Sequence, residues 1–311
     1  MKVVSFLPAA TKMIYDMGLQ EYLYGVTFEC PKEAAVQPKV VRCILEGKNY
    51  SSIEIDRIFS ASKAQGKSLY WVDDALLESI APDIVFTQDI CEVCNIDTVC
   101  TETAVQKLSK QPVLVPLSPN NLQDVFECAI TIARAMGKEE VALRYLAGLQ
   151  QHTDSILDTL RAKRAPLKRA MLMEWIEPVY NCGHWIPFQI AAAGGVDMLS
   201  NPAGDSIVTP WEKILKYNPE VLVIAPCGFD VNRTMEEMEI LTAKAGWSNL
   251  EAVKQRQVYI ADFDLFTQPS IGTLVDGITA LSCMLHPDIF KAEERIEKKF
   301  ITYDLPKVFQ L

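Results

Sequence analysis

The chain has 311 residues, of which 49% are hydrophobic and 23% charged, a balance typical of a globular protein with one large domain or two lobes. Its formal net charge is −10 at pH 7, and no stretch concentrates Lys and Arg densely enough to neutralise a phosphate backbone. No segment approaches the roughly 18 consecutive apolar residues of a membrane span. The sequence therefore argues against nucleic-acid binding and against insertion into a membrane.

The cysteines and the first residues bear on the location of the protein. Nine cysteines, an odd number, lie at irregular spacings, which suits reduced thiols better than a disulfide framework. Residues 3–6 already have the pattern of a structural strand, where an export signal would show a basic start and an apolar stretch. We therefore expect a cytoplasmic protein. The alternative is a periplasmic or extracellular one, if a leader has been removed.

Strand-like and helix-like patterns alternate along the first 137 residues. We expect strands at 3–6, 24–27, 84–87 and 113–115. Helices are expected at 9–18 and 122–136, the first ending at a glycine and the second directly before one. This alternation predicts an α/β lobe with a mainly parallel sheet.

A single long helix is expected at residues 138 to about 164, which contain no proline and only one glycine. At 1.5 Å per residue it would be roughly 40 Å long. A second α/β series begins at residues 169–173. The predicted organisation is an N-terminal α/β lobe at 1–137, a spine helix at 138–165 and a C-terminal α/β lobe at 166–311, with the helix as a rigid connection in place of a flexible linker.

The two halves repeat one local pattern. Residues 76–86 and 214–224 each consist of an amphipathic helix, a proline that stops it, an acidic residue and a buried strand. The loop after the first of these strands carries Cys91 and Cys94, and the loop after the second carries Cys227. Since parallel sheets bind ligands outside the carboxyl ends of their strands, we expect both loops to line a crevice between the lobes.

Several short stretches carry a resemblance to a known family. They are SFLPAAT at 5–11, FECP at 28–31, QDICEVC at 88–94, EWIEP at 174–178, GHWIP at 183–187 and PCGFD at 226–230. With these stretches in an α/β chain of two halves, the sequence resembles the helical-spine, class III periplasmic binding protein-like family of ABC-transporter substrate-binding proteins, and most of all its cobalamin-binding branch. The resemblance implies two three-layer lobes with a ligand cleft between them.

The same resemblance implies the function and the partners. We expect a non-catalytic protein that binds a small molecule, namely cobalamin or a related corrinoid, with an ABC permease as its partner if it is exported. Aromatic side chains would supply flat apolar area, carboxylates would accept hydrogen bonds from amides, and an imidazole would bind cobalt or iron or donate to a corrin amide. The candidate ligand-binding residues are Pro8, Ala9, Glu29, Cys30, Asp89, Glu92, Glu174, His184, Trp185, Phe229, Asp230 and Phe266. Trp175 is a further aromatic candidate that could instead belong to the core.

An alternative function rests on thiols that follow predicted strands. Cys30, Cys91, Cys94 and Cys227, with His184 nearby, could hold a metal ion or an iron-sulfur cluster, which would make the protein a cytosolic metalloenzyme or cluster carrier. A third interpretation is a redox-sensing pair at Cys91 and Cys94. His152 and His286 are interpreted as surface residues. No hydrolase motif is evident, so an enzyme is the less favoured class.

Overall fold

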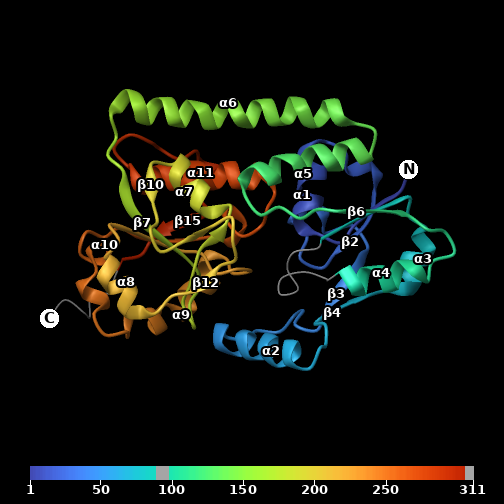
Figure 1. Cartoon of the computed structure of the whole chain (residues 1–311), viewed down its shortest axis with the longest axis horizontal. Helices are drawn as coiled ribbons and strands as arrows, with labels where there is room; N and C mark the ends of the chain where they lie inside the picture. The colour runs from blue at the N-terminus through green and yellow to red at the C-terminus, as the bar shows by residue number, and fades with distance from the viewer. Residues whose placement is uncertain (89–97, 305–311) are drawn as a thin grey trace. The chain divides into compact units, whose positions relative to one another are not determined.

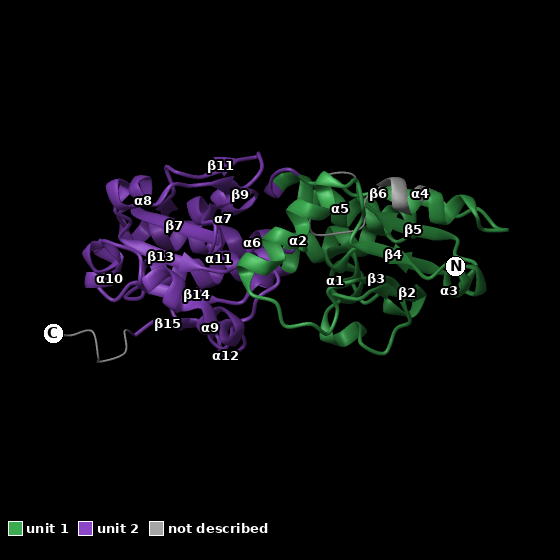
Figure 2. Ribbon diagram, turned by 90° about the horizontal axis from the view of Figure 1, so that it is seen from below, with its two compact units in different colours: residues 1–119, 123–148, 270–272 green, residues 120–122, 149–269, 273–311 purple. Residues whose placement is uncertain are grey.

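The computed structural model describes residues 1–88 and 98–304, which form two α/β units. The first unit comprises residues 1–119, 123–148 and 270–272, and the second comprises residues 120–122, 149–269 and 273–311 (Figure 2). The α/β class with two sheet-containing lobes is therefore confirmed. Within the described part of the chain, no helix combines the length and the apolar character needed to cross a membrane.

The first unit is built on a six-stranded sheet with the order β4-β3-β2-β1-β5-β6. All neighbours are parallel except β3 and β4, which are antiparallel. Its strands are β1 Val3–Ser5, β2 Leu23–Thr27, β3 Lys39–Cys43, β4 Tyr70–Val72, β5 Ile84–Thr87 and β6 Val113–Pro116. The helices α1 Pro8–Asp16, α2 Ser52–Ala64, α3 Asp74–Ile80, α4 Thr98–Gln106 and α5 Leu122–Ala135 connect or follow these strands, with short 3-10 turns at Gln20–Tyr22 and Lys32–Ala34 (Figure 1).

The second unit has a mixed sheet whose centre is parallel. Its order is β12-β8-β7-β13-β14-β15, and β10 also pairs with β7. The central strands β7, β13 and β14 are parallel, whereas β8, β12 and β15 are antiparallel to their neighbours. The strands are β7 Lys168–Trp175, β8 Tyr180–Asn181, β10 Gly195–Val196, β12 Ile207–Val208, β13 Val221–Ile224, β14 Val258–Ala261 and β15 Phe300–Thr302.

The remaining elements of the second unit are helices and one small ribbon. The ribbon joins β9 Gly183–His184 to β11 Asn201–Pro202 in parallel. The helices are α7 Ile186–Ala192, α8 Trp211–Tyr217, α9 Val231–Thr242, α10 Glu251–Lys254, α11 Ile271–Leu285 and α12 Glu294–Glu297, with 3-10 turns at Trp247–Asn249 and Phe263–Leu265. The predicted strands and helices of both halves are thus present, with boundaries that differ by a few residues at most.

The long helix expected from the sequence is α6, Glu139–Lys163. It begins with Glu139 and Glu140 and has Arg161 and Lys163 in its last turn, which is the charge order that a helix dipole favours. The boundary between the two units falls inside it, between Gly148 and Leu149. The predicted bounds, with lobes at 1–137 and 166–311 and a separate spine at 138–165, stay a prediction.

The repeated pattern of the two halves extends to the backbone. Helix α3 ends at Ala81 and helix α8 at Asn218, both in the left-handed conformation with φ of 49° and 52°. A proline follows each of them, and then a strand whose four residues are all buried, β5 or β13. The sequence echo therefore reports a real structural repeat, in which the left-handed residue turns the chain from the helix into the sheet.

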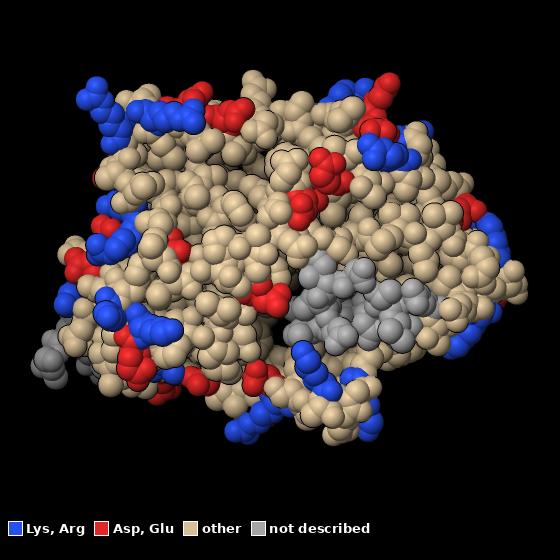
Figure 3. Space-filling view, in the orientation of Figure 1, with Lys and Arg blue, Asp and Glu red and all other residues tan. Residues whose placement is uncertain are grey.

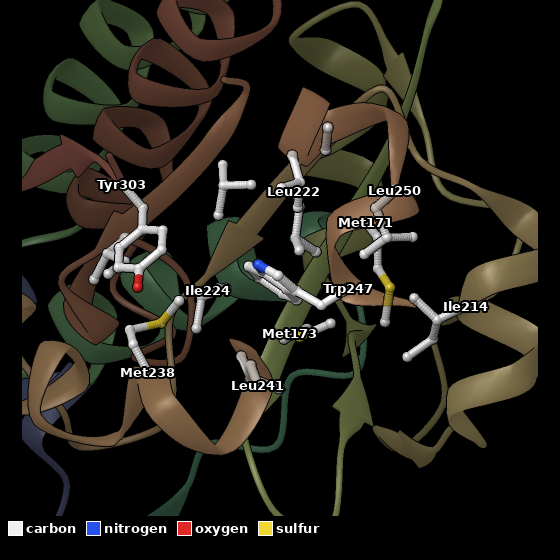
Figure 4. Packing of buried hydrophobic residues seen from close by; sticks show 14 of the residues in the cluster. Met171, Met173, Ile214, Leu222, Ile224, Met238, Leu241, Trp247, Leu250 and Tyr303 are labelled. Atoms are coloured by element: carbon white, nitrogen blue, oxygen red, sulfur yellow. The ribbon is translucent and has the colours of Figure 1, made fainter. Parts of the chain in front are cut away.

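The second unit has a continuous apolar core around Trp247. Its indole lies among Met171 and Met173 of β7, Leu222 of β13 and Leu241 of α9 (Figure 4). The exposed fraction of these side chains is at most 3%. Burial at this level holds the strands in register, and the register decides where the strands end.

We predict that Met173→Ala lowers the free energy of unfolding by about 2–5 kcal/mol, because the fully buried side chain leaves a cavity in the core. The matched control is Met235→Ala on α9, where the side chain is 41% exposed and the change should stay within about 0.5 kcal/mol. Urea denaturation followed by circular dichroism measures both. Equal losses in the two variants would contradict the assignment of Met173 to the core.

Candidate functional site

The carboxyl ends of the three parallel strands of the second unit form the main candidate site. Hydrogen bonds join the loops that follow these strands: the Cys227 N–H donates to the Glu174 carbonyl (3.0 Å), and the Phe263 N–H donates to the Phe229 carbonyl (3.1 Å). The Asp262 carboxylate accepts the Val231 N–H at 2.9 Å. Loops from three strands are thereby held together at one edge, as the parallel topology requires.

An aromatic and charged column stands at this edge. The rings of Trp175, at the end of β7, and Phe229, after β13, have centroids 5.4 Å apart and are tilted by 52°. Phe229 also contacts Arg233, whose guanidinium carbon lies 4.5 Å from the centroid of the Phe229 ring. Arg233 in turn forms ion pairs with Glu236 and Glu237. Phe229 is buried, whereas Trp175 is partly exposed.

Sequence reasoning found Trp175 and Phe229 but missed Arg233 and Glu237. The sequence did contain a signal for this ion pair, since Arg233 and Glu237 are four residues apart and Arg233 comes three residues after Asp230. Asp230 is the N-cap of α9, where its carboxylate accepts the Arg233 N–H at 2.8 Å. The side chain of Asp230 is exposed, so the cap leaves it within reach of solvent.

His184 is held in an unusual backbone conformation by a neighbouring loop. Its φ is 52°, its N–H donates to the Gly204 carbonyl (2.6 Å), and its own carbonyl accepts the Ala203 N–H (3.0 Å). A Cβ on the preceding Gly183 would lie 2.4 Å from the Gly204 carbonyl oxygen, so only glycine permits this contact. The helix predicted to follow His184 is present as α7, with Pro187 as its second residue and not its first. His184 itself was predicted to lie in a turn, but it belongs to the short strand β9.

The electrostatics of His184 favour the neutral imidazole. Burial lowers its pKa below 6.5, and the Asp205 carboxylate, 3.9 Å from Nε2, opposes that shift. The Nδ1 atom is buried and has no hydrogen-bond partner among the described residues. The ring stacks on Trp185 with centroids 5.3 Å apart. A neutral imidazole is suited to bind a metal ion or to accept a hydrogen bond.

Trp185 and Phe266 are tied together within the second unit. The Trp185 Nε1–H donates to the Phe266 carbonyl at 2.6 Å, and Gln189 of α7 donates to the neighbouring Leu265 carbonyl at 3.0 Å. Trp185 is 8% exposed and Phe266 is fully buried. A ligand would reach the Phe266 ring only after its neighbours moved, and its role as a ligand contact stays a prediction.

Glu174 also lies at this edge, as the residue of β7 that precedes the last one, Trp175. Its side chain is 9% exposed and its Oε2 accepts the Ser206 hydroxyl. Ser206 follows Asp205, so the loop that supports His184 is also anchored to β7. Neither Asp205 nor Ser206 was predicted, because nothing in their local sequence indicates that the loop returns to the strand end.

The first unit places four further candidates after its strands β1 and β2. Pro8 occupies the first turn of α1, followed by Ala9, and both are buried. Glu29 and Cys30 follow β2, and the Cys30 thiol donates to the Thr11 hydroxyl at 3.2 Å, which links this loop to α1. The motifs at residues 5–11 and 28–31 therefore meet at the carboxyl edge of the first sheet.

Glu29 has an unusual acidity for a glutamate that solvent reaches. Its pKa is raised to about 7, first because the surrounding protein disfavours the charged form and second because the Glu46 carboxylate repels it. Because the Glu29 side chain is exposed, water weakens both the desolvation and the repulsion by Glu46. The carboxyl group can therefore lose its proton near neutral pH. It then acts as a hydrogen-bond acceptor.

The described residues give no support to the metal alternative. Asp89, Cys91, Glu92 and Cys94 lie outside the described residues. In the part of the chain that is described, no group of three or more His, Cys, Asp or Glu side chains could hold a metal ion. Burial raises the pKa of the Cys30 thiol, which opposes the thiolate that a metal site needs.

One histidine interpretation is wrong. His286 is 5% exposed at the end of α11 and its Nε2 lies 3.3 Å from the Gly194 carbonyl, so it belongs to the core and not to the surface. His152 is exposed on α6, as expected, and contacts Thr279. The burial of His286 depends on its contact with the Gly194 turn, which is distant in the sequence.

Comparison with known proteins identifies the family. A family model described as periplasmic binding protein matches residues 75–265, more than half of the chain. The chain belongs to the periplasmic binding protein family. Over 93% of its length this periplasmic binding protein is 24% identical to an uncharacterized ABC transporter substrate-binding lipoprotein of Bacillus subtilis, and the match covers 81% of that protein.

Solved structures share the fold. A periplasmic haem binding protein of Pseudomonas aeruginosa superimposes with a TM-score of 0.71 at 15% identity, covering 95% of this chain and 96% of that one. A periplasmic vitamin B12 binding protein of Vibrio cholerae gives 0.60 at 16% identity, covering 91% and 96%. At these identities the likeness concerns the fold alone.

The comparisons confirm the family resemblance and overturn the expected location. They place the chain among ABC-transporter substrate-binding proteins, a class that binds a small molecule without converting it. The prediction of a cytoplasmic protein is wrong, because the matched relative is a lipoprotein and the family and solved structures are periplasmic. Reduced cysteines and a strand-like start were poor guides to the compartment.

We predict that His184 titrates below pH 6.5 and that Asp205→Asn lowers its pKa further, because the variant removes the one charge that favours the imidazolium. Histidine carbon-bound proton shifts recorded against pH by NMR measure it, with His184→Gln assigning the signal. Glu212→Gln on α8, an exposed carboxylate, is the control and should leave the titration unchanged. A rise in the pKa of His184 in Asp205→Asn would contradict the assigned electrostatics.

Proposed function

We propose that the chain is the substrate-binding protein of an ABC importer and that its ligand is a corrinoid such as cobalamin. The observation that carries this proposal is the His184 imidazole, which burial favours in its neutral form and which stacks on Trp185. The same unit carries the partly exposed Trp175, which packs on Phe229 at the carboxyl end of β7. Apolar rings match the flat faces of a macrocycle, and Nε2 matches its metal.

Carboxylates support a corrinoid over haem. In the second unit, Glu174 lies near the end of β7, Asp205 precedes β12 and Asp230 is the N-cap of α9, whereas Glu29 follows β2 in the first unit. Each of these carboxylates can accept a hydrogen bond from an amide N–H group of a corrin rim. The basic side chains Lys244 and Lys299 are paired with Glu177 and Asp264 at 2.6 Å. Haem carries carboxylates on its rim, and like charges would repel it from such a surface.

The partner that the family implies is an ABC permease, which would receive the ligand from this protein. On the face shown in Figure 3, acidic and basic side chains are interspersed over the surface, and the basic ones do not gather into a continuous stripe. Either sign of charge is thus available for docking at several places. The proposal concerns the class of partner and not the docking residues.

We predict that cyanocobalamin binds at least about tenfold more tightly than haemin or the iron hydroxamate ferrichrome, a difference of about 1.4 kcal/mol. Isothermal titration of one preparation with the three compounds measures it. Haemin and ferrichrome are suitable competitors, because solved structures with this fold include a periplasmic haem binding protein and a protein of an ABC-type Fe3+-hydroxamate transport system. Haemin or ferrichrome binding more tightly than cyanocobalamin would sink the corrinoid proposal.

We predict that aquocobalamin, whose axial water exchanges with imidazole, shows shifted visible bands when bound and that His184→Ala abolishes the shift and weakens binding about tenfold or more. Because burial lowers the pKa of His184, the neutral imidazole is favoured at neutral pH and the shift should be present at pH 7.5. His152→Ala on α6 is the control and should bind like the unaltered protein. An unchanged spectrum in His184→Ala would show that cobalt has another ligand.

A further inference from the structure

The column at the carboxyl edge of the second unit contains one group with no assigned role, the guanidinium of Arg233. It is enclosed between an aromatic ring and two carboxylates: its carbon lies 4.5 Å from the Phe229 centroid, its Nη1 is 3.2 Å from Glu236, and its Nη2 pairs with Glu237. The Glu237 side chain is 6% exposed and that of Arg233 is 21% exposed. The arrangement is therefore a fixed part of the fold and not a mobile surface pair.

The geometry points to Arg233 as a positioning residue for Trp175. Phe229 is 5% exposed and has Trp175 and the guanidinium as ring partners, so any displacement of Arg233 is passed to Phe229 and from there to the indole. Trp175, at the end of β7, is the aromatic member of the column that is partly exposed, since Phe229 is buried. This inference rests on the proposed function: the indole is the flat surface that meets the ligand.

Hydrogen bonds hold the backbone of Phe229 and of the first turn of α9 in place. The Phe229 carbonyl accepts the Phe263 N–H at 3.1 Å, and Asp230 caps α9 through the Arg233 N–H. Arg233 and Glu237 lie four residues apart on this capped helix, so their side chains meet on one face. With the backbone held, the orientation of Phe229 depends on the contact with Arg233.

The chemistry of arginine explains why another cation would not serve equally. A guanidinium is planar, stacks on an aromatic face and donates to a carboxylate at the same time, whereas an ammonium is a compact point charge. Arg233 would then determine the orientation of the Trp175 indole without contacting the ligand itself. The class of ligand that suits such a platform is a molecule with an extended flat face, which includes corrinoids and excludes small hydrated ions.

The experiment follows the indole N–H signals of the five tryptophans by nitrogen-15 NMR. Trp175→Phe assigns the Trp175 signal, and Trp71→Phe, a 48% exposed residue of β4, assigns a reference signal. Without ligand, Arg233→Met should move the Trp175 signal and leave the Trp71 signal in place, and Arg233→Lys should move it less. The double variant Arg233→Met/Glu237→Gln also removes the charge of the buried carboxylate that pairs with Arg233, which provides a second variant in case the single one does not fold. An unmoved Trp175 signal in a folded variant overturns the positioning role.

Titration with cyanocobalamin, which is diamagnetic, tests the second half of the inference. The Trp175 signal should shift on binding while the Trp71 signal stays, and both Trp175→Leu and Arg233→Met should weaken binding by about tenfold, with partial recovery in Arg233→Lys. Binding that leaves the Trp175 signal unmoved overturns the contact. If cyanocobalamin, haemin and ferrichrome all fail to bind, the proposed function falls together with the contact, whereas the ligand-free spectra still decide whether Arg233 positions Trp175.

Discussion

The parallel alignment of β7, β13 and β14 is the constraint on which the candidate site depends. In this alignment Ile224 of β13 pairs with Met173 of β7 and with Ile260 of β14, so the three strands reach their carboxyl ends at one edge. Each loop that leaves this edge begins within hydrogen-bonding distance of the next, and Cys227, Phe229 and Asp262 all take part in such bonds. The buried apolar side chains around Trp247 keep that alignment fixed.

Two kinds of polar environment follow from this edge. The Arg233 guanidinium is neutralised by Glu236 and Glu237 and serves the packing of Phe229. Burial keeps the His184 imidazole neutral, with Asp205 exposed beside it. The ion pairs of Arg233 hold the side chains of this edge in place, and the neutral His184 imidazole provides a group that can bind a metal or accept a hydrogen bond. A binding surface needs both, a rigid support and a group that interacts with the ligand.

The sequence predicts the parts of this structure that repeat or that are long. The α/β class, the helix α6 and the paired helix-proline-strand units at Ile84–Thr87 and Val221–Ile224 were all expected, because periodicity and proline act locally. Trp175 and Phe229 were found because they lie at the end of a predicted strand or in the loop after one, and His184 because it precedes a predicted helix. The ligand-binding role of the candidate residues remains a prediction.

The rest was hidden because it depends on contacts between distant segments. The two-residue strands β8 to β12 are too short for a hydrophobic pattern, so the loop that brings Asp205 to His184 and Ser206 to Glu174 was invisible. His286 was misjudged because its burial comes from the Gly194 turn, far away in the chain. The compartment was misjudged because cysteine usage and the first residues report only indirectly on export.

Hydrogen exchange measured with and without cyanocobalamin tests the central claim most directly, since it locates the ligand on the chain without substitutions. The account predicts slower exchange at residues 174–175, 183–185, 203–206 and 226–230, which leave or support the carboxyl edge of the second sheet, and no change in α10 or α12. Binding that protects other segments and leaves these four unchanged would contradict it.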